Sequence, residues 1–185
     1  MKIEDIYTNY LDQEFLKFGY GSFTVSLKNQ FVQMISDRKS LPFTSITEQF
    51  IFEYHKELKQ EFIKLQCEED VLTGFTASNG HVYRTNRDDQ TNMIGQKDFL
   101  NDHPEVATVK WKTEDQGYII HTREEWLKIY LEAFYNKMMK LEKYNQLKEK
   151  IRLATTEAEI IAVDWDSVEL PVESEEPEEE TQPTE

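Results

Sequence analysis

The residue types best able to do chemistry in this chain are four histidines, one cysteine and one pair of adjacent aspartates. The histidines are His55, His81, His103 and His121. None of them has the His-x3-His or Cys-x2-Cys spacing that places two ligands on one metal. Asp88 and Asp89 could hold a cation, but two adjacent acids are more typical of the start of a helix. The pattern therefore predicts no metal site.

Cys67 is the single cysteine, so it cannot form an internal disulfide. It stands in a predicted helix next to Glu68, Glu69 and Asp70, whose negative charges disfavour the thiolate that a nucleophile needs. The sequence also lacks a glycine-rich loop that opens a helix and a Gly-x-Ser-x-Gly elbow. We therefore expect no enzyme, no catalytic residue and no cofactor.

The negative charge is concentrated at one end of the chain. Twelve acidic residues and no Lys or Arg follow Arg152, so residues 1–152 carry a net charge of only −3 out of −15. Such a body lacks the basic footprint that neutralises phosphates, which argues against nucleic acid as a partner. No apolar run reaches the roughly 20 residues that span a bilayer, and the first ten residues have acids where a signal peptide is apolar. We expect a protein partner, no membrane and a cytoplasm-like compartment.

Two long helices are predicted to organise the fold. Thr122 and Glu125 have capping-box spacing, and no Pro or Gly follows until after residue 151, which predicts one helix over 122–151. Ser45 and Glu48 predict a second helix over 44–69, with a narrow apolar stripe. Such stripes suit helix pairing, either with 122–151 of the same chain or in a homo-oligomer through 44–69 or 122–151.

The regions before and between these helices are predicted to be mixed. Apolar spacing from Ile3 to Phe18 predicts an amphipathic helix, and alternation over 22–34 predicts two short strands, or a strand and a bend. Asn79-Gly80 predicts a tight hairpin over 75–83. A short helix over 88–100 and a second hairpin over 106–121 follow. The fold class is therefore α+β, with hairpin, helix and hairpin packed on the long helix.

The long helix carries a wide apolar face, which we predict to be core. Its residues are Trp126, Ile129, Tyr130, Ala133, Phe134, Met138, Leu141, Tyr144 and Ile151. Replacing Trp126 or Phe134 by Ala would then cost about 3–5 kcal/mol through cavity formation. Thr156 and Glu159 predict a short capped helix, after which Trp165 packs back on the body. Residues 171–185 are rich in glutamate, which predicts a disordered tail. The functional alternative is that this tail is an acidic arm that binds a basic surface on a partner.

These elements divide the chain into four predicted parts. They are a small N-terminal α/β region (1–43), a linking helix (44–69), an α+β domain (70–166) and the acidic tail (167–185). The first helix is either folded onto the body or used for docking, and the second helix has a narrow stripe. The candidate partner-binding residues on these two helices are Tyr7, Tyr10, Phe15, Phe50, Tyr54 and Leu58.

Several residues in a fixed order carry a family resemblance. They are the Asn-Gly hairpin from Phe75 to Tyr83, Gln90 with Asn92, Ile94 and Gly95, then Trp111, Thr122, Ala154-Thr155-Thr156 and Asp164-Trp165. Over about residues 70–165 the chain resembles a phage-encoded domain-of-unknown-function family (family 4376) found in tail-fibre assembly-like and tail-associated proteins. It departs from many relatives in a long helix rich in Tyr, Phe, Lys and Met instead of Ala and Leu.

The resemblance implies a context and no catalytic residues. It implies a bacteriophage or prophage structural protein of tail or tail-fibre assembly that binds a virion or tail-fibre component. Such a protein would act in the host cytoplasm during assembly and could remain in the virion. The alternative is an acidic host-directed binding protein that inhibits a host factor as a nucleic-acid mimic would.

Overall fold

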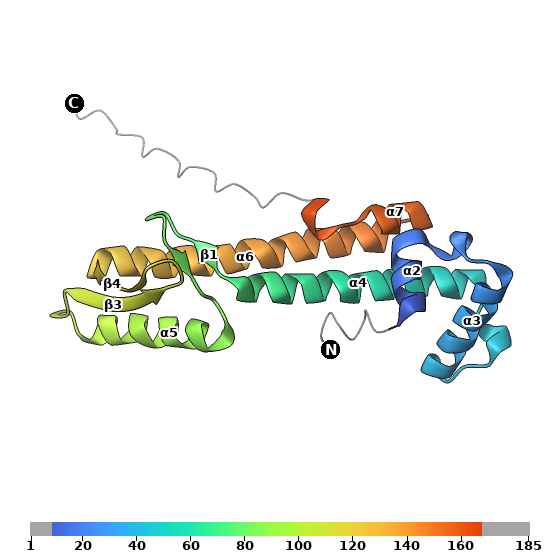
Figure 1. Ribbon diagram of the computed structural model, residues 1–185, viewed down its shortest axis with the longest axis horizontal. Helices are drawn as coiled ribbons and strands as arrows, with labels where there is room; N and C mark the ends of the chain where they lie inside the picture. Colours follow the sequence, from blue (N-terminus) through green and yellow to red (C-terminus); the bar gives the residue numbers. More distant parts are fainter. Residues whose placement is uncertain (1–8, 168–185) are drawn as a thin grey trace, which may run out of the picture.

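The computed structural model describes residues 9–167, so the predictions for Tyr7 and for the acidic tail from residue 168 onward lie outside it. Its elements, labelled as in Figure 1, are α2 (Tyr10–Phe18), η1 (Tyr20–Ser22), α3 (Val25–Lys39), η2 (Phe43–Ser45), α4 (Glu48–Thr73), β1 (Phe75–Thr76), β2 (Val82–Tyr83), α5 (Arg87–Asp102), β3 (Thr108–Thr113), β4 (Gly117–Thr122), α6 (Arg123–Leu153), α7 (Glu157–Ala162) and η3 (Trp165–Ser167). The predicted α+β class is confirmed.

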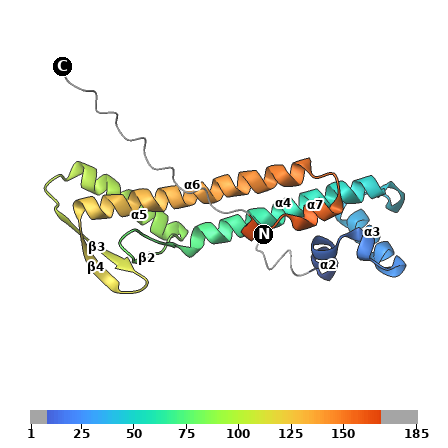
Figure 2. The same ribbon diagram turned by 90° about the horizontal axis from the view of Figure 1, so that it is seen from above.

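The molecule is elongated around an antiparallel pair formed by α4 and α6 (Figure 1). With 26 and 31 residues, these helices are about 39 and 46 Å long at a rise of 1.5 Å per residue. The helices α2 and α3 lie at one end of the pair, and the strands and α5 lie at the other, as the view in Figure 2 also shows. Of the two pairings expected for the narrow stripe of 44–69, the one with the long helix of the same chain is present.

The strands predicted over 22–34 are wrong, because this segment enters the helix α3. Thr24 caps the helix by accepting a hydrogen bond from the amide of Leu27. Phe31, Val32 and Ile35 then share one buried face at helical spacing. Val25 belongs to the alternating set but lies exposed in the first turn, so the alternation reflected a loop and a helix start.

The core of this helical end is built from aromatic and branched side chains. Phe15 lies 4.5 Å from Phe31 and 6.3 Å from Tyr54 between ring centroids. These rings join α2, α3 and the first half of α4 in one buried cluster. Glu157 of α7 ties the same end to the C-terminal part, because its carboxylate accepts the amide of Tyr20 at 3.0 Å.

The start of α4 differs slightly from the prediction. The capping residue is Thr47 instead of Ser45, and its hydroxyl accepts the amide of Phe50. The helix also continues past residue 69 to Thr73. Gly74 ends it with a φ of +99°, and a Cβ at this position would clash with the Tyr83 carbonyl oxygen. Only glycine fits both the left-handed backbone and the close approach of β2.

A buried lysine and a tryptophan link the two helices of the α4–α6 pair through Asp70. Lys140 of α6 donates to the Asp70 carbonyl at 2.8 Å, and its Nζ lies 3.1 Å from the Asp70 carboxylate. Trp165 Nε1 donates to the same carboxylate at 3.2 Å. The predicted return of Trp165 onto the body is confirmed, as is the capping box of Thr156 and Glu159 at α7.

At the opposite end, two antiparallel hairpins pack against α6 without joining into one sheet. β1 pairs with β2 through Phe75 opposite Tyr83, and β3 pairs with β4 through Trp111 opposite Ile119. The loop of the first hairpin is longer than the two-residue turn that Asn-Gly favours, since the Ala77 amide donates to the His81 carbonyl. Together with α5, the hairpins enclose a core that includes Tyr83, Leu100, Val109, Trp126 and Ile129.

No helix within residues 9–167 is both long enough and apolar enough to cross a membrane.

Candidate functional site

The long helix α6 has large apolar side chains on two opposite faces. The inner face is buried and includes Trp126, Ile129, Ala133, Leu147 and Ile151. The outer face carries five large apolar side chains, and the exposed fractions are 50 % for Leu131, 50 % for Phe134, 48 % for Tyr135, 46 % for Met138 and 37 % for Leu141. These five residues are called the outer stripe below. An exposed apolar face on one helix is the typical signature of a protein-binding surface.

The prediction that Phe134, Met138 and Leu141 belong to the core is wrong. The neighbours of α6, which are α4, α5, α7 and the two hairpins, pack against the inner face and its flanks. The apolar face of the sequence is wider than these neighbours cover. For Trp126, Ile129, Ala133 and Ile151 the prediction is confirmed.

The outer stripe has the spacing of a helix-pairing seam. Leu131, Phe134, Met138 and Leu141 are separated by three, four and three residues. This is the alternation of a and d positions in a heptad repeat, which keeps the side chains on one narrow face. Lys128 and Glu142 are exposed on the same helix and lie beside the stripe. The surface therefore combines an apolar centre with a charged edge.

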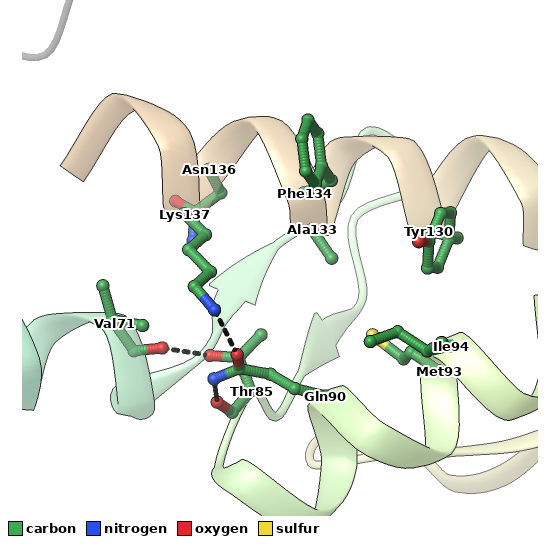
Figure 3. Close-up of a pocket in the computed structure, with 10 residues that line it drawn as sticks. All are labelled: Val71, Thr85, Gln90, Met93, Ile94, Tyr130, Ala133, Phe134, Asn136 and Lys137. Atoms are coloured by element: carbon green, nitrogen blue, oxygen red, sulfur yellow. Dashed lines mark hydrogen bonds between the residues drawn. The ribbon is translucent and has the colours of Figure 1, made fainter. Parts of the chain in front are cut away.

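A small cavity of about 90 Å³ lies next to Phe134, between α5 and α6 (Figure 3). Met93, Ile94 and Tyr130 supply apolar walls. The polar side is a chain of hydrogen bonds in which Lys137 donates to Gln90 and Gln90 donates to the Thr85 carbonyl, each at 2.7 Å. Pockets for drug-sized ligands measure about 300–1,000 Å³, so this cavity suits one inserted side chain. Ile94 is half-exposed beside it and extends the apolar surface.

The partner-binding residues predicted from the sequence do not form one surface. Phe15 and Tyr54 are buried in the helical end, so their assignment as partner contacts is wrong. Tyr10 is exposed, and Phe50 and Leu58 are half-buried against that core. A role in partner binding stays a prediction for these three residues. Tyr7 lies outside the described residues.

The nucleophile candidate Cys67 is buried between α4 and α6, 3.6 Å from the Lys140 carbonyl oxygen. Burial, followed by the charges of Asp70 and Glu68, raises the pKa of its thiol to about 11. The thiolate is the reactive form, so this thiol is inert near neutral pH. The sequence indicated the direction of this shift, whereas the dominant cause is burial.

The histidines are separated in the structure as well. His55 is buried on the ring of Phe15, with 4.2 Å between ring centroids, and neither of its nitrogens has a hydrogen-bond partner among the described residues. Burial, followed by the charge of Lys59, lowers its pKa to about 4. His121 is also buried, and its Nε2 lies 3.4 Å from the Tyr83 hydroxyl. These two histidines belong to the packed interiors of opposite ends.

The remaining chemical candidates stabilise local structure. His81 Nδ1 lies 2.8 Å from the Asp115 carboxylate, which also accepts the Val82 amide and thereby ties the two hairpins together. These contacts lower the pKa of Asp115 to about 2. Asp88 and Asp89 lie in the first turn of α5, as predicted, where Asn86 is the capping residue. Within residues 9–167, no three His, Cys, Asp or Glu side chains are grouped to hold a metal ion.

Sequence reasoning missed the outer stripe because it assigned Phe134, Met138 and Leu141 to the core and left Leu131 and Tyr135 out of the apolar face. The missed signal was the extent of that face. Large apolar residues at 131, 134, 135, 138 and 141 stand on the side opposite 126, 129, 133, 147 and 151. Neighbours on one side of a helix cannot cover both sets.

The geometry describes an elongated α+β protein whose most distinctive surface is an unpartnered apolar helix face. The family model of a domain of unknown function, DUF4376, matches residues 54–166, and the chain belongs to this family. The match begins within α4 and ends at η3, so the family domain includes most of the long helix pair. No curated protein and no solved structure matches the chain.

Proposed function

We propose that the protein is a structural or assembly protein of a bacteriophage or prophage tail that acts by protein binding without catalysis. The observation that carries the proposal is the outer stripe, which presents five large apolar side chains on one rigid helix. The resemblance of residues 70–165 to tail-fibre assembly-like and tail-associated proteins supplies the biological context. The proposed location is the host cytoplasm during assembly, followed by the tail of the particle.

The position of the stripe supports a binding role physically. The helix α6 is held along its inner face by α4, α7, α5 and the hairpins, so the outer side chains are presented by a preorganised element. Burying about half of one large apolar side chain is worth roughly 1 kcal/mol, so five of them can supply useful affinity. The side cavity beside Phe134 can accept one partner side chain.

Complementation of a deletion in the phage, followed by mass spectrometry of purified particles, would test this function. The wild type should restore particles with tail fibres, and Leu131→Glu should fail because a charge in the stripe opposes burial. Asn29→Glu, which adds the same charge on the exposed surface of α3, is the matched control and should complement. Absence of the protein from particles, together with normal fibres in the deletion strain, would refute the proposal.

A host-directed role would give a different result. A host protein retained by the full chain at low salt and released near ~1 M salt, where the screening length is about 3 Å, would point to charge-based mimicry. Retention through the apolar stripe would be far less sensitive to salt.

A further inference from the structure

We propose that the outer stripe is the contact between two copies of this chain, whose α6 helices pair antiparallel about a twofold axis near Asn136. The proposal rests on the proposed function only in taking the stripe as a protein contact. It goes further by naming the partner at that site as a second copy and by fixing the orientation of the pair.

The first argument is that the stripe is self-complementary in this orientation. Leu131 lies as far before Asn136 as Leu141 lies after it, and Phe134 and Met138 are related in the same way. An antiparallel neighbour therefore places Leu131 opposite Leu141 of the second copy. Phe134 then meets Met138 of the second copy, whose flexible thioether packs well against a ring. A closed twofold contact of this kind uses one surface on both subunits.

The second argument is charge complementarity at the edge of the stripe. Lys128 and Glu142 stand on the same side of α6, about two turns to either side of Tyr135. In the antiparallel pair each Lys128 faces Glu142 of the second copy, so the symmetry forms the ion pair twice. Lys137, on the other edge, is turned toward α5, where its ammonium donates to Gln90 at 2.7 Å. Its charge is thereby drawn away from the axis.

The third argument is area. The five stripe residues and Ile94 are each about half or a third exposed. With about 150–250 Å² for an aromatic side chain, and values near the lower end for Leu, Ile and Met, the six together offer roughly 500 Å² of apolar surface per copy. The charged edges add to this. The total approaches the ~800 Å² per partner of a standard stable interface. The stripe therefore has the size of a dimer contact, well beyond that of scattered exposed residues.

The mass in solution tests the existence of the dimer. Sedimentation equilibrium is suitable because the elongated shape of the chain does not bias it. The wild type and the Asn29→Glu control should show twice the chain mass of 22.0 kDa at micromolar concentration. Leu131→Glu should show the single-chain mass with an unchanged far-ultraviolet circular dichroism spectrum. A single-chain mass for the wild type at all concentrations up to about 100 µM would overturn the proposal.

Cysteine crosslinking tests the orientation. Leu131→Cys and Leu141→Cys are prepared separately, one with a longer tag, then mixed and oxidised. An antiparallel pair should give the mixed disulfide product and little crosslinking of either variant alone. Crosslinking within each single variant and none in the mixture would indicate a parallel pair and overturn the proposed register. The wild type controls for Cys67, which is buried and should not react.

Charge reversal tests the edge contact. Lys128→Glu and Glu142→Lys should each weaken the dimer by about tenfold, and the double variant should restore it. If the double variant weakened the dimer by the product of the two single effects, the two charges would not interact and the charge argument would be refuted.

The outcomes separate this inference from the proposed function. A dimer that never enters particles and is dispensable for fibres would refute only the tail function. A chain that stays monomeric, while Leu131→Glu still blocks particle assembly, would refute only the dimer.

Discussion

The two faces of α6 contain the same residue types and have different environments. Trp126 and Ile129 on the inner face are fully buried, whereas Leu131 and Phe134 on the outer face are half-exposed. Hydrophobicity and helical spacing do not distinguish them. The difference lies in the number of neighbours that the fold supplies on each side, and that number depends on the tertiary arrangement of α4, α5 and the hairpins. One helix thus serves as a core element and as a candidate contact surface.

The largest effect is expected from the inner face. Trp126→Ala should lower the free energy of unfolding by about 3–5 kcal/mol, since it removes a fully buried ring that packs on Trp111 at 5.2 Å between centroids. Urea unfolding followed by circular dichroism measures this loss. A loss below about 1 kcal/mol would show that the inner face is not the core of this end.

The buried core also includes His55 of α4, and the pH dependence of stability tests its environment. The pKa of His55 is about 4 in the fold, against about 6.5 in the unfolded chain, so the unfolded state binds more protons between these values. The contribution of His55 to the free energy of unfolding is therefore fully present above pH 6.5. The free energy of unfolding should fall by about 3 kcal/mol as the pH drops to 4.

The variant His55→Phe keeps an aromatic ring on Phe15 and removes the titration. Its unfolding free energy should be almost constant between pH 6.5 and 5, where the wild type already loses stability. Identical slopes in both proteins would show that His55 is charged in the fold, or that other groups cause the loss.

Two lysines on α6 allow a buried position to be compared with an exposed one. Lys140 is buried with Asp70, so Lys140→Met should cost about 2 kcal/mol by removing the ammonium that neutralises the Asp70 carboxylate and donates to the Asp70 carbonyl. Lys137 is exposed, and Lys137→Met should cost less than about 1 kcal/mol. Thermal unfolding of both variants gives the comparison, and equal losses would contradict the assigned environments.

The smallest effect on folding is expected on the outer stripe. Phe134→Ala should change the unfolding free energy of the single chain by less than about 1 kcal/mol, because half of the ring is already in water. This value replaces the 3–5 kcal/mol expected from sequence alone. Denaturation at submicromolar protein concentration measures it, and a loss above about 2 kcal/mol would place Phe134 in the core.

The sequence predicted the elements whose signals are local. The caps at Thr122 and Thr156, the hairpin around Gly80 and the return of Trp165 are all present, because each depends on a few neighbouring residues. The segment 22–34 was predicted as strands because the alternation of Phe23, Val25 and Leu27 spans a loop and the first turn of α3.

The candidate site was harder to predict than the fold. Exposure of Phe134 depends on where α5 and α4 stop covering α6, which no local pattern encodes. Burial of Phe15 and Tyr54 likewise depends on the meeting of three helices. Sequence periodicity identified which faces are apolar, and the structure was needed to show which apolar face is left without a partner.

The dependence of the melting temperature on protein concentration tests the two-face interpretation most directly. If the outer stripe pairs two copies, the melting temperature of the wild type should rise by about 2 °C for each tenfold increase in concentration, because association stabilises the folded state. Leu131→Glu should melt at one temperature throughout, equal to that of the dilute wild type. A wild-type melting temperature independent of concentration, or a Leu131→Glu variant that is unfolded when dilute, would contradict the assignment of separate roles to the two faces.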